Sequence, residues 1–126
     1  MERKYDLEDR VIGFSSTVIK LAEALPPAGT ARYLAKQIMR CGVAPSLLYG
    51  EAQSAESRDD FIHKMKVALK ELKETRVCLK LILKNGMADN IEGICCENEQ
   101  LIAIFCKSIE TAKRNNGSGD SLRPQS

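Results

Sequence analysis

The chain has 126 residues, 44% of them hydrophobic, which is enough for one domain with a substantial core. Its 19 basic and 17 acidic side chains leave a net charge of +2, which alone indicates no polyanionic partner. No apolar run approaches the roughly 18 residues that a membrane span needs, and the N-terminus lacks a signal-peptide hydrophobic region. We therefore expect a cytoplasmic protein with no membrane partner.

The first predicted helix covers residues 5–25. Asp6 is a suitable N-cap, and acidic residues follow in the first turn. The apolar residues recur at steps of three and four and form one face: Val11, Phe14, Val18, Leu21 and Leu25. The pair Pro26-Pro27 ends this helix.

A second helix is predicted over residues 30–53, with Thr30 as its cap. Its apolar face consists of Leu34, Ile38, Cys41, Pro45 and Leu48. Pro45 removes a backbone donor from the helix interior and, with Gly42 three residues earlier, predicts a kink. The kink either lets the helix wrap the core or presents Tyr49 or Glu51 to a partner.

The third predicted helix, residues 58–84, has the clearest pattern in the chain. Ser57, with Asp60 three residues later, resembles a capping box with a shorter acid. Seven residues recur at alternating steps of four and three, the spacing of a coiled coil, and must be buried against other helices: Phe61, Met65, Ala68, Leu72, Thr75, Leu79 and Ile82. Further apolar residues, Ile62, Leu69 and Leu83, widen this arc, either as core or as a subunit interface. Asn85-Gly86 ends the helix.

Asn90 is predicted to cap a fourth helix within residues 87–114, with Ile91, Phe105 and Ile109 on its buried face. Residues 115–126 have the composition of a disordered tail. Connections of a few residues force sequential helices to run antiparallel. The sequence therefore predicts an all-α fold, an up-down-up-down antiparallel four-helix bundle over residues 1–114.

Residues suited to catalysis are sparse. His63 is the single histidine, and its position beside the seam of the third helix indicates a solvent-facing residue. The five cysteines include no C-x-x-C pair, which favours buried free thiols over a zinc site. No phosphate-cradling loop or nucleophile elbow occurs. We therefore expect no enzymatic activity, no cofactor and no metal site.

Positive charge is concentrated on the two middle helices, whose net charges are +2 over residues 30–53 and +4 over residues 58–84. The second helix places Arg32, Lys36 and Arg40 on one face. On the third, helical spacing aligns Lys66, Lys70, Lys73, Lys80 and Lys84. These cations form either a solvated face, neutralised in part by Glu71 and Glu74, or a surface for phosphates.

Residues 40–79 carry a resemblance to a known family. The pattern combines a basic residue and glycine in the second helix with a motif that runs into the third. The matching residues are Arg40, Gly42, Tyr49, Glu51, Ala52, Ala55, Ser57, Asp60, Phe61, Ile62, Lys64, Ala68, Leu69, Lys70, Glu71, Glu74 and Thr75. The segment resembles the four-helix-bundle proteins related to those encoded in intervening sequences of bacterial 23S ribosomal RNA genes. The chain departs from that pattern at Leu48, where Asn is usual, and at Val77-Cys78, where aromatic residues are expected.

The resemblance implies a bacterial, non-enzymatic bundle that assembles as a homopentamer around a central channel. A related branch, the accessory variability proteins of retroelements, binds nucleic acid and a reverse transcriptase through a basic surface. By analogy, the nucleic-acid-binding candidates are Arg32, Lys36, Arg40, Lys66, Lys70 and Lys73. We expect a scaffold that binds RNA or DNA through these residues, or else a protein-protein assembly factor that binds no nucleic acid.

Overall fold

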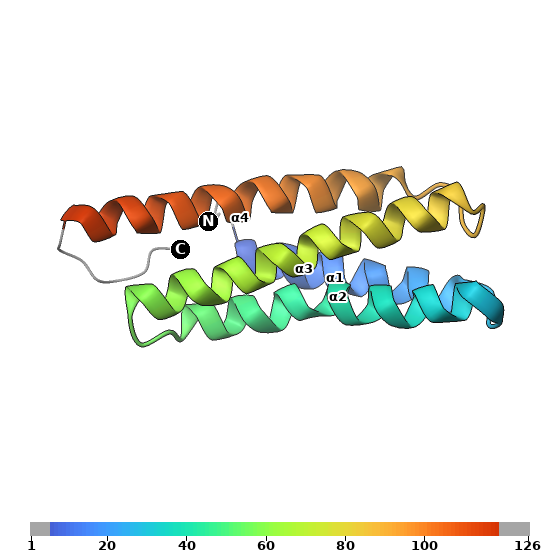
Figure 1. Ribbon diagram of the computed structural model, residues 1–126, viewed down its shortest axis with the longest axis horizontal. Coiled ribbons are helices and arrows are strands. Elements are labelled where there is room, and N and C mark those ends of the chain that lie inside the picture. Colours follow the sequence, from blue (N-terminus) through green and yellow to red (C-terminus); the bar gives the residue numbers. More distant parts are fainter. Residues whose placement is uncertain (1–5, 119–126) are drawn as a thin grey trace.

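The computed structural model describes residues 6–118, with side chains through Asn115. Four helices account for nearly all of this range, and it contains no strand. In chain order they are α1 (Leu7–Ala24), α2 (Gly29–Gln53), α3 (Arg58–Lys84) and α4 (Glu92–Ser118). They form the elongated bundle of Figure 1. None of these helices is both long enough and apolar enough to cross a membrane.

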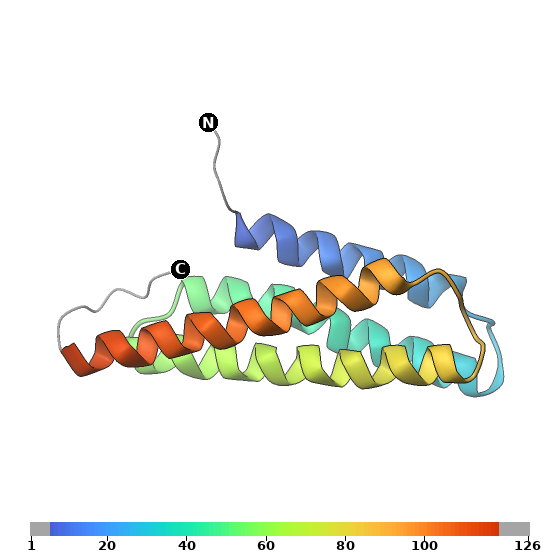
Figure 2. The ribbon, with the colours of Figure 1, turned by 90° about the horizontal axis from the view of Figure 1, so that it is seen from above.

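Helices that follow one another in the chain also pack against one another. α2 packs along α1 and α3, and α4 packs along α3. The α1–α4 pair closes the ring with the least extensive contact, and the backbones of the two diagonal pairs do not approach each other closely within the described residues. In Figure 2 the N-terminal end of α1 diverges from the other helices. This arrangement confirms the predicted all-α four-helix bundle and leaves its α1–α4 side the most open.

The core is mainly aliphatic, with a few aromatic rings such as Phe61 and Phe105, and it follows the predicted faces closely. All seven residues of the predicted seam of α3 are buried, as are the five predicted on the face of α1. Ile62 and Leu69, the extra apolar residues of α3, pack half-buried against this core, whereas Leu83 is 43% exposed. The wider arc of α3 therefore serves mainly the fold.

Side-chain caps fix two of the helix starts. Asp6 accepts a hydrogen bond from the backbone N–H of Asp9, and Ser57 accepts one from Asp60, as predicted. α2, however, begins at Gly29 after Ala28, without a side-chain cap, so the cap predicted at Thr30 is wrong. Thr30 already lies within the first turn.

The second correction concerns α4, which begins at Glu92 rather than directly after Asn90. Asn90 has a φ of +57°, a left-handed conformation that asparagine tolerates better than most residues. Asn90 therefore forms a turn in the connection between α3 and α4 and does not cap α4. At its other end α4 continues to Ser118, so residues 115–118, predicted to belong to a disordered tail, are helical. Residues 119–126 lie outside the described residues.

A close approach of α1 and α2 surrounds Gly42 and Pro45. A Cβ placed on Gly42 would lie 2.6 Å from Cγ1 of buried Val18. The Ser15 hydroxyl donates to the Gly42 carbonyl at 2.7 Å, and the Ser46 hydroxyl donates to the Val11 carbonyl at 3.1 Å. α2 continues through Pro45, which is buried.

Tyr49 and Glu51 do not form a common surface after Pro45. Tyr49 is 4% exposed and packs on Phe105 of α4, with ring centroids 5.9 Å apart. Its role is in the core, so the suggestion that the bend presents Tyr49 to a partner is wrong. Glu51 is exposed and forms an ion pair with Lys64 of α3 at 3.3 Å. That pair joins the helices next to their connection.

Candidate nucleic-acid interface

The six candidate residues are all solvent-exposed, and they occupy the outer faces of two adjacent helices. Arg32, Lys36 and Arg40 lie on α2, and Lys66, Lys70 and Lys73 lie on α3. Because α2 and α3 pack along each other, the two sets belong to one side of the bundle. They do not, however, merge into one uninterrupted cationic surface.

Arg40 is the only one of the six with an ion pair inside the described range. Its Nη1 atom lies 3.2 Å from Oε1 of Glu71, and its Nη2 atom lies 3.3 Å from Oε1 of Glu74. The hydrogen bond with Glu74 raises the pKa of the guanidinium above its ordinary value. Two carboxylates of α3 therefore stand between Arg40 and the α3 lysines, and they offset its charge.

The two carboxylates differ in environment. The Glu71 side chain is 14% exposed and that of Glu74 is 49% exposed. Burial raises the pKa of Glu71 above its usual value, since desolvation disfavours the charged form. The pKa of Glu74 is lowered, first by its hydrogen bond with Glu71 and further by Arg40 and Lys70. Glu74 is thus the carboxylate that stays charged most readily beside Arg40.

The lysines of α3 remain available to solvent. Lys66, Lys70, Lys73, Lys80 and Lys84 are exposed, and no ion pair within the described residues involves any of them. Helical geometry places them on one face, because their spacings of three, four and seven residues return to the same side. Arg76 of the same helix binds Glu99 of α4 at 3.1 Å. On α2 and α3, the exposed lysine and arginine side chains without an ion pair in the described residues are therefore the five α3 lysines, together with Arg32 and Lys36 on α2.

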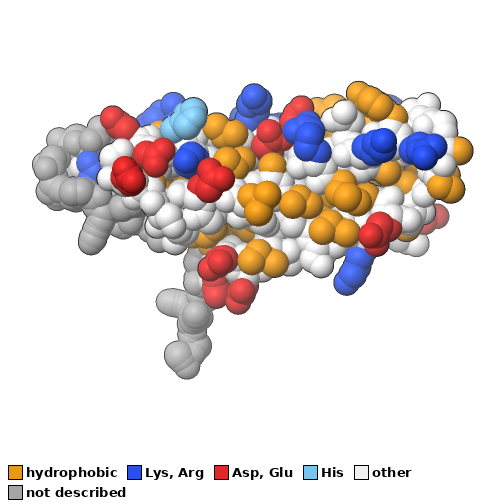
Figure 3. All heavy atoms as spheres, turned by 90° about the horizontal axis from the view of Figure 1, so that it is seen from below, with side chains coloured by type: hydrophobic (Ala, Val, Ile, Leu, Met, Phe, Trp, Pro, Cys, Tyr) orange, Lys and Arg blue, Asp and Glu red, His pale blue; other side chains and the backbone are white. Residues whose placement is uncertain are grey.

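An exposed apolar area, which the sequence pattern did not identify, lies over α1 and α2. A shallow groove of about 640 Å³ is lined by apolar side chains together with Lys36 and Arg40: Ile19, Met39, Val43, Ala44 and Leu47. Leu47 is 66% exposed. Figure 3 shows hydrophobic side chains gathered near the middle of the face below α2, with lysine and arginine side chains spaced around them. One sign of this groove in the sequence was Leu47, an apolar residue next to Leu48 but outside the predicted buried face of the second helix.

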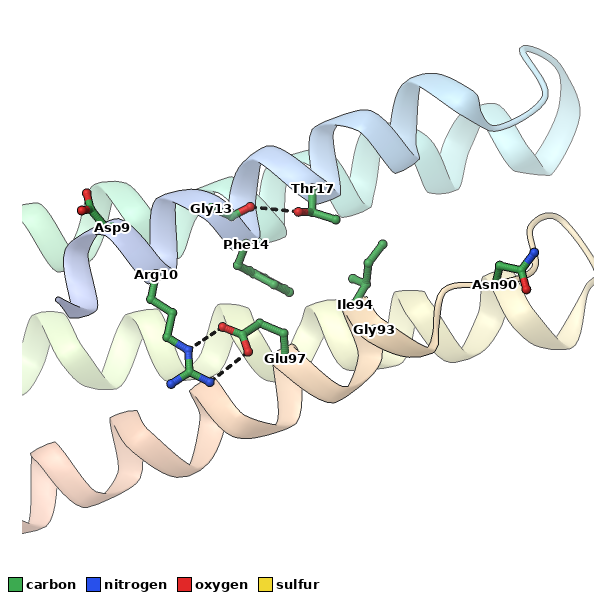
Figure 4. Close-up of a pocket in the computed structure, with 9 residues that line it drawn as sticks. All are labelled: Asp9, Arg10, Gly13, Phe14, Thr17, Asn90, Gly93, Ile94 and Glu97. Atoms are coloured by element: carbon green, nitrogen blue, oxygen red, sulfur yellow. Dashed lines mark hydrogen bonds and ion pairs between the residues drawn. The ribbon is translucent and has the colours of Figure 1, made fainter. Parts of the chain in front are cut away.

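A second hollow, of about 510 Å³, opens between α1 and α4. Figure 4 shows Phe14 of α1 and Ile94 of α4 reaching into it. At one end Arg10 bridges the two helices, donating from Nε to Glu97 at 2.6 Å and from Nη2 to the other carboxylate oxygen at 2.9 Å. Gln100 accepts a further bond from Arg10. These charged groups link the least packed pair of helices, a contact that one-dimensional spacing could not predict.

The described residues contain no group of three or more His, Cys, Asp and Glu side chains placed to hold a metal ion. His63 is exposed, as its position on the helix predicted. All five cysteines are free thiols. Most ion pairs of the described residues join two helices, as Arg10–Glu97, Arg40–Glu71 and Arg76–Glu99 do.

The geometry defines a small all-α four-helix bundle whose outer faces carry separate cationic and apolar areas. The chain belongs to the family of 23S rRNA-intervening sequence proteins, which matches it over residues 3–104. This confirms the family resemblance found in the sequence.

Among solved structures, the chain is similar to a protein of unknown function from the S23 ribosomal protein family of Bacteroides thetaiotaomicron. The two share 27% sequence identity with a TM-score of 0.78, over 82% of this chain and 98% of the other. Comparison with curated proteins finds no match.

Proposed function

We propose that this protein is a non-enzymatic oligomeric scaffold that binds RNA or DNA through phosphate contacts of α2 and α3. The observation that carries the proposal is the line of exposed α3 lysines that form no ion pair among the described residues: Lys66, Lys70, Lys73, Lys80 and Lys84. Like charges four residues apart cost a helix about 0.2–0.5 kcal/mol per pair, so the line does not serve the stability of α3. Clustered cations of this kind bind phosphates without reading bases.

Within this surface the six candidates have unequal roles. Lys66, Lys70 and Lys73 supply unpaired charge on α3, and Arg32 and Lys36 add exposed charge from α2. Arg40 would have to leave Glu71 and Glu74, or keep them and contribute less net charge. We therefore place the main contact along the α3 lysines, with Arg40 at its edge.

A triple charge reversal tests this contact. Changing Lys66, Lys70 and Lys73 to Glu should weaken binding to RNA and DNA of any sequence, because the lost contacts are to phosphates. The fold should persist, since exposed charges contribute little to stability. The matched control reverses Lys107, Lys113 and Arg114, which are exposed on α4 and give the same change in net charge. Equal losses from the two variants would show that nonspecific attraction, not the α3 surface, accounts for binding.

Self-association is the second part of the proposal, and we propose a pentamer. Large exposed apolar side chains support it, above all Leu47 in the groove of α1 and α2, since such residues on a small bundle favour burial against another surface. Light scattering should give a multiple of the 14.0 kDa chain mass. Leu47→Asp should lower that mass if the α1–α2 groove is part of the interface. A monomer at micromolar concentration would refute self-association.

The apolar groove also favours one alternative function, a protein-protein assembly factor without nucleic-acid binding. In that case the groove of α1 and α2 contacts the partner, and the α3 lysines are a solvated rim. Leu47→Asp would then abolish partner binding, whereas the triple lysine reversal would leave it intact. The two functions are distinguished by which variant loses binding: the lysine reversal should lose nucleic-acid binding, and Leu47→Asp should lose protein binding.

A further inference from the structure

One aromatic side chain is exposed on the side of the bundle that carries the cations. Tyr33 of α2 is 61% exposed, whereas the other aromatic side chains of the described range are buried. Arg32 directly precedes Tyr33, and Lys36 follows it by about one helical turn. Both cations are exposed, and neither forms an ion pair with another described residue. Tyr33 therefore lies in solvent between two unpaired cations of the candidate interface.

Two ion pairs define how α2 and α3 lie against each other. Arg40 pairs with Glu74, and further along α2 Glu51 pairs with Lys64, in both cases at 3.3 Å. The residue number on α3 falls as the residue number on α2 rises, so the two helices run antiparallel. Tyr33 precedes Arg40 by seven residues, which is about two helical turns. Its neighbours across the contact are therefore the residues about two turns after Glu74.

The α3 residues at that position are apolar and basic. Leu81 follows Glu74 by seven residues and is 43% exposed, and Val77, one turn before Leu81, is 56% exposed. Lys80 and Lys84 are close to Leu81 on the same helix, and both are exposed without an ion pair in the described range. Figure 3 shows lysine and arginine side chains spaced along the right half of this side of the bundle. We call the three exposed hydrophobic residues the Tyr33 platform: Tyr33, Val77 and Leu81.

We propose that Tyr33 stacks on an unpaired base, so that this surface binds single-stranded nucleic acid in preference to a duplex. The inference rests on the proposed function, in which lysine and arginine side chains hold the phosphates. Every base has a flat aromatic face, so stacking on Tyr33 requires no particular sequence. In a duplex the bases are already stacked on one another and paired, so the ring has no free face to contact. Phosphate contacts alone serve both forms, and Tyr33 distinguishes between them.

The chemistry around the Tyr33 platform fits a single strand better than a protein. A single strand alternates flat bases with negatively charged phosphates, and proteins that bind it combine aromatic side chains with a cationic surface. Four exposed cations surround the platform: Arg32, Lys36, Lys80 and Lys84. Glu74, one turn before Val77, is held by Arg40 at 3.3 Å. The groove of α1 and α2, by contrast, is lined mostly by apolar side chains and does not include Tyr33, so it suits a protein surface rather than a base.

Strand preference tests the proposal on the whole protein. The affinities for a single-stranded oligonucleotide without self-complementarity and for its duplex are measured at one salt concentration. Tyr33→Ala should weaken single-strand binding about 5- to 150-fold, the effect of losing one base–aromatic stack, and should leave duplex binding unchanged. Tyr33→Phe should keep the single-strand affinity, because the ring remains. Ile12→Ala is the matched control, since Ile12 is a 50% exposed hydrophobic residue on α1, and it should change neither affinity.

Several results would overturn the stacking role of Tyr33 and leave the phosphate contacts of α3 standing. One is that Tyr33→Ala weakens single-strand and duplex binding equally, or weakens neither. Another is that Tyr33→Phe loses as much single-strand affinity as Tyr33→Ala. If Tyr33→Ala changes neither affinity but lowers the mass found by light scattering, the Tyr33 platform is a contact between copies of the chain and not a site for bases. Absence of binding to both forms by the unaltered protein would overturn the proposed function together with this inference.

Discussion

Replacing Gly42 by Ala tests how closely α1 and α2 must approach. The added Cβ would lie 2.6 Å from Cγ1 of Val18, which is fully buried and cannot rotate away freely. Overpacking of this kind costs about 1–3 kcal/mol. Alanine also gains up to about 1 kcal/mol over glycine in a helix interior. We therefore expect a net loss of free energy of unfolding for Gly42→Ala of up to about 2 kcal/mol.

Gly50→Ala provides the control in the same helix. A Cβ at Gly50 meets nothing within 4 Å, so this variant should keep or slightly raise the stability. Urea unfolding of both variants at one protein concentration gives the difference, which we expect to be about 1–3 kcal/mol because the helix-propensity gain largely cancels. Equal stabilities would show that the close approach at Gly42 does not constrain the packing of α1 on α2.

Two further comparisons test the core and the Arg40 cluster. Leu72→Ala should destabilise the protein by about 2–5 kcal/mol, because Leu72 is fully buried, whereas Leu83→Ala, at a 43% exposed position, should cost much less in the same urea titration. Because the pKa of Glu71 is raised on folding, its contribution to stability is present at acidic pH and is lost as pH rises through the folded-state pKa. Glu71→Gln should therefore be at least as stable as the parent at neutral pH, with its advantage fading in acid. Glu74, whose pKa is lowered, contributes stability above the unfolded-state pKa and loses it as pH falls. Glu74→Gln should accordingly be the less stable at neutral pH, and the opposite order of the two variants would refute the assignment of their environments.

The sequence was sufficient to predict the four helices and most of the buried core residues. The seam from Phe61 to Ile82 could be predicted because burial on one side of a helix leaves a direct periodic signal. Apolar periodicity does not identify buried polar residues, of which Asn98 is an example. Asn98 is 1% exposed and donates to the Leu72 carbonyl at 3.2 Å, while its own side-chain oxygen has no hydrogen-bond partner among the described residues. A polar residue at such a position cannot be distinguished from a surface residue by hydropathy alone.

Local chemistry predicted some helix ends and not others. Ser57 and Asp6 cap as expected because their side chains reach the backbone N–H groups of the same turn. Thr30 and Asn90 have equally suitable side chains, but Gly29, with a φ of +62°, and Asn90 itself adopt left-handed conformations that move each boundary. The geometry of the connections, rather than cap preference, decided these two positions.

The candidate surface was the least predictable feature. Helical spacing correctly aligned the α3 lysines on an exposed face, and the alternative in which Glu71 and Glu74 neutralise part of the charge holds at Arg40. Helical spacing could not show that the two carboxylates would leave the lysines themselves without ion pairs in the described residues. It also could not show that Arg76 would turn to Glu99 on α4. Such pairings depend on the rotation of each helix about its axis, which is set by packing around the whole ring.

The central claim is that the α3 lysines bind nucleic-acid phosphates, and the salt dependence of binding tests it most directly. The affinity of the unaltered protein for a duplex DNA and for an RNA of unrelated sequence is titrated across a range of salt concentrations. Neutralising phosphates releases counterions, so the logarithm of the affinity should fall steeply, with a slope of about 0.9 per phosphate contacted on duplex DNA. The lysine reversal should flatten that slope. No binding at low salt, or binding that salt leaves unchanged, would contradict the account.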